Sequence, residues 1–328
     1  MARIFIDGFE SQKWLVSAGG VWDIAIGAGF AVSTPGYGGV GYCYGSPNSG
    51  SKLGKYLPSA ASYYVGFHFK LTGGNDRIFR FSNGAVILGV LHYNTTTGLF
   101  SVYKGDQATL LATGTIPVNP GDWCHIQIYY LPHATAGTFT VKVNGVQDIN
   151  FSGSTAPSTS NIDKIDLYAS GGGYYPYWDN VVVDDSAWPG VSRVAILSPS
   201  GAGFSAQWDP SVAPNYACVD EVPYSDTDFI STNVVDEVDT YAMSDLPSEA
   251  AVIKCVQVSA RARKEGVATP QNLALAVRTT GGDYYSANQA LQTEYQSHSK
   301  IWEQNPGTAA AWTVSEVNAM EGGVKSRT

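Results

Sequence analysis

Short stretches in which hydrophobic and polar residues alternate dominate the first half of the sequence, and a period of two is typical of β-strands. In residues 139–151, FTVKVNGVQDINF, two such stretches flank Asn144-Gly145. This dipeptide suits the positive φ angles of a type I′ turn, so the segment predicts a β-hairpin. Further strands are predicted at residues 63–71, 77–82, 85–93, 99–105 and 124–130. Strands at such close and even spacing indicate a β-sandwich or barrel.

The pattern changes near Asp184, where DDSAWPGVSRVAILSPSGAG places prolines, glycines and serines around one short apolar run. A connector between two domains is the simplest interpretation of this composition. We set the boundary at residue 190, so the predicted domains are 1–190 and 191–328.

The second domain is predicted to contain further strands, clearest at residues 252–263 and 273–279, with Gly281-Gly282 as a hairpin turn. Only the segment TVSEVNAMEGG, which begins at Thr313, has helical spacing. It starts with a Thr/Glu capping box, and Gly322-Gly323 is expected to end the helix.

The composition supports an all-β fold, because 36 glycines and 20 tyrosines in 328 residues favour strands joined by tight turns. The formal net charge is −9, which argues against a nucleic-acid partner, since phosphate binding needs a basic face. Nine acidic residues and no Lys or Arg lie between Asp220 and Glu249. We interpret this window as a solvated surface, with a cation site as the alternative.

The N-terminal sequence MARIFIDGFE enters a strand pattern at once and lacks the basic and apolar segments of a cleavable secretion signal. The longest apolar run, residues 85–91, is too short to span a bilayer. We therefore expect neither membrane insertion nor export by the standard route.

The four cysteines are widely spaced and match no zinc or redox motif. Alternation in WCHIQIYY places Cys124 on one face with Ile126 and Ile128, and places His125 and Gln127 on the other. We expect Cys124 to be a buried thiol. A disulfide is neither required nor excluded.

Several motifs follow one another in a recognisable order. A short opening strand with Asp7-Gly8-Phe9 is followed by LGKYLPSAASYYVGFHFKL, PGDWCHIQIYYLP, TFTVKVNGVQ and YYPYWDNVVVDD. This order resembles the concanavalin A-like, or laminin-G-like, jelly-roll fold over residues 1–188.

A second resemblance concerns the whole chain. The LGKYLP segment before a VGF strand is similar to segments in structural proteins of tailed bacteriophages, and VQVSARARKEG and KIWEQNPGTAAAWTVSEVNAMEGGVK resemble a C-terminal module that recurs in phage virion proteins. The resemblance implies a virion protein that assembles in the bacterial host cytoplasm. Its implied partners are other virion proteins and further copies of this chain, as a homo-oligomer.

The segment GGGYYPYWDNVVVDD, residues 171–185, holds the clearest candidate binding site. The apolar face of a sugar stacks on aromatic rings while its hydroxyls reach carboxylates and amides. Tyr174, Tyr175, Tyr177 and Asp179 are therefore candidate residues for binding a host-surface glycan.

The alternative interpretation of this segment is structural, and we favour it. Laminin-G-like domains commonly end in a strand of the form aromatic-Asp-Asn-aliphatic. Strict alternation puts Trp178, Asn180 and Val182 on the side opposite Tyr177 and Asp179, and half of these side chains must face a core.

No cofactor is expected. Calcium binds several carboxylate and carbonyl oxygens on loops. Some laminin-G-like domains bind calcium, so the resemblance makes calcium a possible ligand here. The candidate donors form no D-x-D-x-D-G loop; they are Asp76, Asp106, Asp179, Asp184 and Asp185.

A polysaccharide-degrading enzyme is the main alternative function, because many glycan hydrolases share the concanavalin A-like fold and use paired carboxylates. Retaining members carry E-x-D-x-E or E-x-D-x-x-E on one strand. The nearest match, Glu237-Val238-Asp239, lacks the third acid and lies outside the first domain. We predict a non-enzymatic virion structural protein, tail-associated or capsid-decorating, with host carbohydrate as a candidate ligand; a depolymerase and a free lectin-like adhesin are the alternatives.

Overall fold

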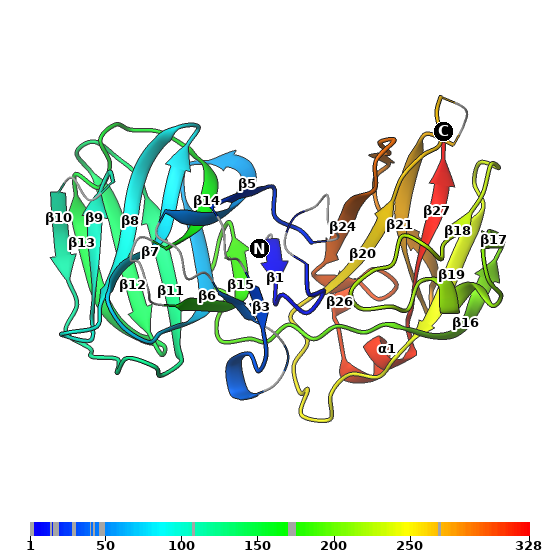
Figure 1. Cartoon of the computed structure of the whole chain (residues 1–328), viewed down its shortest axis with the longest axis horizontal. Helices are drawn as coiled ribbons and strands as arrows, with labels where there is room; N and C mark the ends of the chain where they lie inside the picture. The colour runs from blue at the N-terminus through cyan, green and yellow to red at the C-terminus, as the bar shows by residue number, and fades with distance from the viewer. Residues whose placement is uncertain are drawn as a thin grey trace. The chain divides into compact units, whose positions relative to one another are not determined.

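A computed structural model describes residues 3–13, 15, 20–27, 31–39, 41, 43–45, 50–106, 109–169, 175–267 and 270–328. The chain divides into two compact units (Figure 1). Unit 1 comprises Met1–Phe9 and Trp22–Val194, and unit 2 comprises Glu10–Val21 and Ala195–Thr328. Glu10–Val21 thus belongs to unit 2, whereas the first domain of the sequence analysis included it.

Unit 1 contains strands β1 to β15 and a short 3₁₀ turn, η2. Their bounds are β1 Arg3–Asp7, β2 Ile24–Ile26, β3 Ala31–Ser33, η2 Tyr37–Gly39, β4 Cys43–Gly45, β5 Ser51–Ala60, β6 Tyr63–Leu71, β7 Asn75–Asn83, β8 Val86–Asn94, β9 Leu99–Lys104, β10 Thr109–Thr113, β11 Cys124–Leu131, β12 Gly137–Val143, β13 Val146–Gly153, β14 Ile162–Ala169 and β15 Pro176–Asp184.

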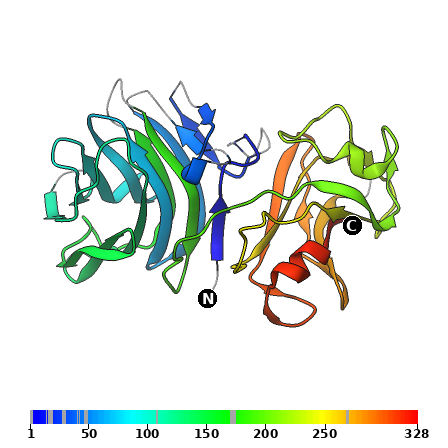
Figure 2. The same ribbon diagram turned by 90° about the horizontal axis from the view of Figure 1, so that it is seen from below.

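These strands pair antiparallel in two sheets. Sheet 1 has the order β13-β12-β11-β6-β15-β4-β3, with β1 also paired to β15, and sheet 2 has the order β10-β9-β8-β7-β14-β5-β2. Figures 1 and 2 show the sheets as the two layers of a sandwich. Each sheet joins one run of consecutive strands, β11 to β13 or β7 to β10, to strands from distant parts of the chain.

The core of unit 1 lies between these sheets. Phe67 of β6 stacks on Phe79 of β7 with ring centroids 5.3 Å apart, and Phe81 of β7 stacks on Tyr130 of β11 at 4.7 Å. Each of these rings is buried, as is Trp178 of β15. Burial of a side chain of this size stabilises a fold by about 1.5–3 kcal/mol, so the inward residues of alternate strand positions hold the sandwich together.

Local expectations for unit 1 are confirmed at several positions. Asn144 and Gly145 join β12 to β13 with φ angles of 50° and 85°, the left-handed values that a type I′ turn needs. Cys124 is 2% exposed and has no disulfide partner. Burial raises the pKa of its thiol to about 12, so it is an inert apolar group.

Unit 2 is also built mainly from strands. Its elements are β16 Pro199–Ala206, β17 Asp209–Pro210, η3 Asn215–Cys218, β18 Ile230–Ser231, β19 Val238–Met243, β20 Val256–Ala262, β21 Asn272–Thr279, β22 Gly282–Tyr285, β23 Gln289–Ala290, β24 Gln296–Trp302, β25 Gln304–Asn305, β26 Ala310–Ala311, α1 Val314–Ala319 and β27 Glu321–Arg327.

A six-stranded sheet organises unit 2, with the order β16-β19-β27-β21-β22 and β23 paired to β21. The predicted strands at 252–263 and 273–279 correspond to β20 and β21, and the predicted turn at Gly281-Gly282 leads from β21 into β22. One cluster of buried side chains forms the core: Val256, Leu273, Leu275, Val277, Leu291, Trp302, Trp312, Val317, Met320 and Val324.

The C-terminal helix is confirmed, but its expected end is wrong. Thr313 and Glu316 form the predicted capping box of α1. Gly322 and Gly323 do not end the helix, because both lie inside β27. A Cβ atom on Gly323 would lie 2.1 Å from the carbonyl oxygen of Asp239, so these glycines let β27 approach β19 closely.

The all-β class is confirmed: a concanavalin A-like jelly-roll sandwich is followed by a second β-rich unit with one short C-terminal helix. In the described ranges, we find no helix with the length and hydropathy needed to cross a membrane.

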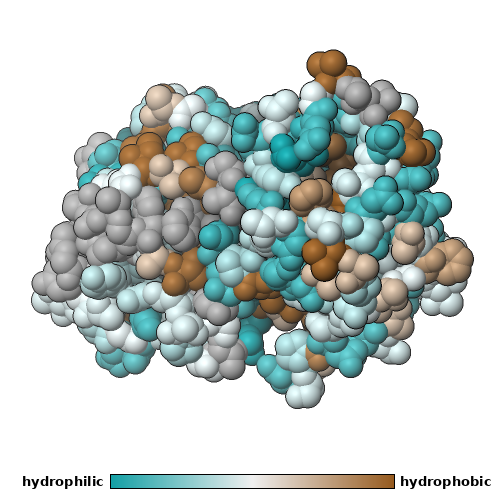
Figure 3. Space-filling model, turned by 45° about the vertical axis from the view of Figure 1, so that its right-hand side comes forward, coloured by the Kyte–Doolittle hydropathy of each residue, from teal (hydrophilic) through white to brown (hydrophobic). Residues whose placement is uncertain are grey.

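Exposed hydrophobic side chains are scattered on the surface. Examples are Tyr56, Phe204 and Val252, which are 57%, 72% and 74% exposed. On the face drawn in Figure 3, the coloured hydrophobic residues form small patches separated by hydrophilic ones. The homo-oligomer expected from the sequence stays a prediction.

Replacing Trp178 with alanine should lower the free energy of unfolding of unit 1 by about 3–5 kcal/mol, because it leaves a cavity beside Phe69 and Tyr44. Calorimetry and circular dichroism during urea unfolding would measure the loss. Tyr56→Ala, at a side chain 57% exposed, is the control and should stay within about 0.5 kcal/mol of the parent. A similarly small effect of Trp178→Ala would contradict the placement of its indole.

Candidate functional site

Two of the predicted sugar-binding residues lie together at the start of β15. Tyr175 is 46% exposed, and its ring stacks on that of Tyr177 with centroids 6.3 Å apart and planes 20° apart. Tyr177 is paired with Gly45 of β4, and a Cβ on Gly45 would lie 2.9 Å from two ring atoms of Tyr177. The missing side chain at Gly45 therefore gives the Tyr177 ring its place against the neighbouring strand.

Two further residues extend this surface. Lys70, the register partner of Tyr177 on β6, holds its ammonium nitrogen 4.8 Å from the Tyr177 ring centroid and 4.9 Å from that of Trp123. The side chains of Lys70 and Trp123 are partly exposed. We call Tyr175, Tyr177, Lys70 and Trp123 the aromatic platform. Lys70 and Trp123 were not predicted, although Lys70 lies at an outward position of a predicted strand.

Asp179, another predicted site residue, lies two positions along β15 from Tyr177, opposite His68, and is 2% exposed. One of its carboxylate oxygens accepts a hydrogen bond of 2.8 Å from the backbone N–H of Tyr37. The Tyr37 ring then stacks on His68 at 3.6 Å and meets Trp123 edge-on at 6.1 Å. The carboxylate therefore fixes the backbone that supports the platform.

The expected alternation along this strand is wrong at Asn180. A β-bulge interrupts the pairing of β15 with β6 between Asp179 and Val182, and Asn180 has a φ of 51°. Its side chain lies 3.4 Å from His68 and accepts a 2.7 Å hydrogen bond from the N–H of Val194. Asn180 thus faces the polar side of sheet 1 and not the core with Trp178.

Residues 188–194, which we call the strap, lie across the remaining outer face of sheet 1. The Trp188 ring meets Tyr64 of β6 edge-on at 5.2 Å, and the ammonium of Lys142 on β12 lies 3.9 Å from the Trp188 ring. The N–H of Gly190 donates to Gln127 of β11 at 3.0 Å. The strap covers the middle of this face, so a ligand surface is best sought at the end that carries Tyr177.

Two histidines lie on this face, between the platform and the strap. His68 is fully buried, His125 is 5% exposed, and their rings are 4.9 Å apart. Burial lowers the pKa of His68 to about 3, with smaller contributions from His125 and Arg193. Burial also lowers the pKa of His125 to about 4, so both imidazoles are neutral at pH 7.

The structure says less about two further predictions, the role of Tyr174 and the binding of calcium. Tyr174 lies outside the described residues. Within the described part, no group of three or more His, Cys, Asp or Glu side chains could hold a metal ion. Of the candidate calcium donors, Asp106 pairs with Arg77 at 2.7 Å and Asp184 pairs with Arg3 at 3.0 Å. The absence of a cofactor stays a prediction.

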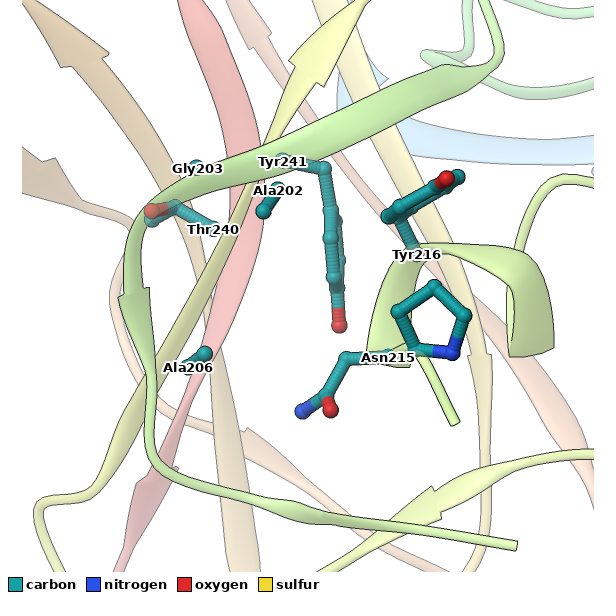
Figure 4. Close-up of a pocket in the computed structure, with 8 residues that line it drawn as sticks. Ala202, Gly203, Ala206, Asn215, Tyr216, Thr240 and Tyr241 are labelled. Carbon is teal, nitrogen blue, oxygen red and sulfur yellow. The ribbon is translucent and has the colours of Figure 1, made fainter. Parts of the chain in front are cut away.

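Unit 2 contains a small pocket of about 90 Å³ (Figure 4). Two of its polar side chains are engaged: the Asn215 amide donates to Asp239 at 2.9 Å, and the Tyr241 hydroxyl donates to the same carboxylate oxygen at 2.7 Å. The pocket is lined by Ala202, Gly203, Ala206, Pro214, Asn215, Tyr216, Thr240 and Tyr241.

The two acids of the enzyme alternative, Glu237 and Asp239, do not line this pocket. Asp239 is fully buried, and burial raises its pKa while Asn215 and Tyr241 lower it. Glu237 accepts a hydrogen bond from the Thr232 hydroxyl. Both carboxylates therefore accept hydrogen bonds from other side chains of unit 2.

Comparison with known proteins finds no matching family model and no matching curated protein. Among solved structures, the carbohydrate-binding module CBM66 from Bacillus subtilis is similar over 50% of this chain and 96% of its own, with 11% identity and a TM-score of 0.37. A protein of unknown function with a galectin-like fold from Bacillus subtilis is similar over 56% and 96%, with 11% identity and a TM-score of 0.38.

Domain 4 of AbnA, an extracellular arabinanase from Geobacillus stearothermophilus solved with arabinotriose, is similar over 55% of this chain and 91% of its own, with 16% identity and a TM-score of 0.37. Likeness at these identities and TM-scores concerns the β-sandwich fold alone. None of these three structures is described as a virion protein, and they carry no argument about a ligand of this chain.

The stability of unit 1 should fall as the pH drops below about 6.5, because an unfolded histidine then binds a proton that buried His68 and His125 do not. The groups that face His68 are Tyr37, Asn180, His125 and Arg193. The slope should reach about 1.4 kcal/mol per pH unit for each histidine, down to about pH 4 for His125 and about pH 3 for His68.

Urea unfolding at several pH values would measure this slope, and nuclear magnetic resonance would follow each imidazole. His125→Gln should reduce the slope by the contribution of one histidine, about 1.4 kcal/mol per pH unit. Titration of either imidazole near pH 6.5 in the folded protein would contradict the burial of the pair.

Proposed function

We propose that this chain is a non-enzymatic glycan-binding protein and that the aromatic platform of unit 1 contacts the sugar. The observation that carries the proposal is the pair of partly exposed rings of Tyr177 and Trp123 beside the ammonium of Lys70, with the exposed ring of Tyr175 stacked on Tyr177. Aromatic faces accept the apolar face of a pyranose, and an ammonium donates hydrogen bonds to its oxygens.

The rigidity of the platform also supports this proposal. The Tyr177 ring lies against Gly45 and beside Lys70, and Asp179 holds the Tyr37 backbone beneath it. A site that is fixed before the ligand arrives loses less conformational entropy on binding. Repeated copies in an assembly would strengthen binding that is weak at each single site.

The absence of catalysis is part of the proposal. The acids closest to the platform and those of the predicted Glu237 and Asp239 pair are bound to protein groups. Glycoside hydrolysis needs two carboxylates that face the scissile bond. Binding without turnover is therefore the function that these contacts support best.

The setting of the protein in a bacteriophage virion is the further part of the proposal. It rests on the resemblance of the LGKYLP segment and of the second half of the chain to phage structural proteins. In this setting other virion proteins and copies of the chain are the partners, and host-surface glycan is the ligand. A tail-associated and a capsid-decorating position are both compatible with it.

Replacing Tyr177 with alanine should weaken glycan binding at least about tenfold, because a stacking surface of one ring is lost. Tyr175→Ala should weaken it as well. Isothermal titration calorimetry with polysaccharide from the host surface would measure the change, after a glycan array has identified a binding polymer. Tyr56→Ala removes an exposed tyrosine from β5 of the other sheet and is the matched control. Unchanged affinity of both platform variants would refute the site.

Antibody raised against the purified protein should label purified phage particles in immunogold electron microscopy. Label at the tail would support a role in host adhesion, and label over the capsid would support decoration of the head. Particles that carry no label, together with a protein that is monomeric in solution, would refute the virion setting but leave glycan binding open.

A further inference from the structure

Lys70 differs from most other cations of unit 1 in what surrounds its charge. Arg3, Lys55 and Arg77 each pair with a carboxylate, at 3.0, 3.1 and 2.7 Å. Within the described residues, the Lys70 ammonium has neither an ion pair nor a hydrogen bond, and its contacts are the rings of Trp123 and Tyr177. These rings hold the charge in place without neutralising it.

The nearest acids along the chain and the strand register are engaged elsewhere. Asp122, beside Trp123, accepts a hydrogen bond of 3.1 Å from the Asn119 amide. Asp179 accepts from the Tyr37 backbone at 2.8 Å and is buried. The N–H donors of Lys70 are therefore available at the surface where the two tyrosine rings lie.

We infer that the platform prefers acidic glycans, with Lys70 as the residue that selects a sugar carboxylate. This inference rests on the proposed glycan-binding function and adds the substrate class to it. A sugar stacked on Tyr177 lies within reach of the ammonium 4.8 Å from that ring. A carboxylate on the sugar then forms a charge-assisted hydrogen bond, which is stronger than a bond to a neutral hydroxyl.

A second lysine provides a matched control. Lys142 also lies over an indole, that of Trp188, at 3.9 Å, and on the same sheet. It belongs to β12, which is separated from β15 by β11 and β6. A nonspecific attraction of acidic polymers to the surface would involve Lys142 as well, whereas selection at the platform requires Lys70.

The test compares acidic polymers with their own carboxyl-reduced forms and with unrelated neutral polymers. Polygalacturonate, alginate and hyaluronate, and the carboxyl-reduced form of each, are titrated into the protein together with neutral xylan, galactan and dextran. At least one acidic polymer should bind about five- to tenfold more tightly than its reduced form at low salt, and the difference should shrink as salt screens the charge.

Lys70→Gln should remove this preference while weaker binding to the reduced form persists, Lys70→Arg should retain it, and Lys142→Gln should leave it unchanged. Thermal melts would verify that each variant is folded. Equal affinity for the acidic and reduced forms, or a preference that survives Lys70→Gln, would overturn the inference. Binding of the neutral polymers would still support the proposed function in that case. Binding of none of the polymers would overturn both.

Discussion

Strand β15 is paired along both edges, and unit 1 depends on this double pairing. Its whole length lies against β6, while β4 and β1 share its other edge. A one-residue slip in a strand exchanges its two faces, so a register held from both sides fixes every side chain. Trp178 consequently points into the core, and its neighbour Tyr177 points outward to the platform.

The bulge at Asn180 adds a second consequence to the same strand. One extra residue turns an amide toward the polar face, where it contacts both His68 and the backbone of Val194. Without this irregularity the same position would face the aromatic core. A buried amide there would have lost its hydrogen bonds to water, which is costly unless the core offers partners.

The sequence was sufficient to predict most of the fold of unit 1 and half of its candidate site. Period-two alternation and Asn144-Gly145 carry short-range information, so the strands and the hairpin could be predicted. The pairing of Tyr175 with Tyr177 is also local. Lys70 was missed because it joins the platform through the pairing of β6 with β15, and Trp123 because it precedes β11, which pairs with β6. No local pattern specifies either pairing.

The acidic window of unit 2 illustrates the same limit. Asp226 forms two hydrogen bonds with Arg261, and Asp236 pairs with both Lys325 and Arg327. The cations come from β20 and β27, far along the chain. The negative charge of this window, which has no Lys or Arg of its own, is thus partly balanced by cations that folding brings close to it.

Because of the strap, the C-terminal boundary of the sandwich lies beyond the end of its last strand. Every strand of unit 1 is complete at Asp184, yet Trp188, Gly190 and Val194 make contacts with β6, β11 and β15. A gene fragment cut at the last strand would encode both sheets and leave the side chains of one face without their cover. The segment of the gene that encodes a fully covered unit 1 therefore includes both the sandwich and the strap. Recombination that moves this unit intact must keep the two together.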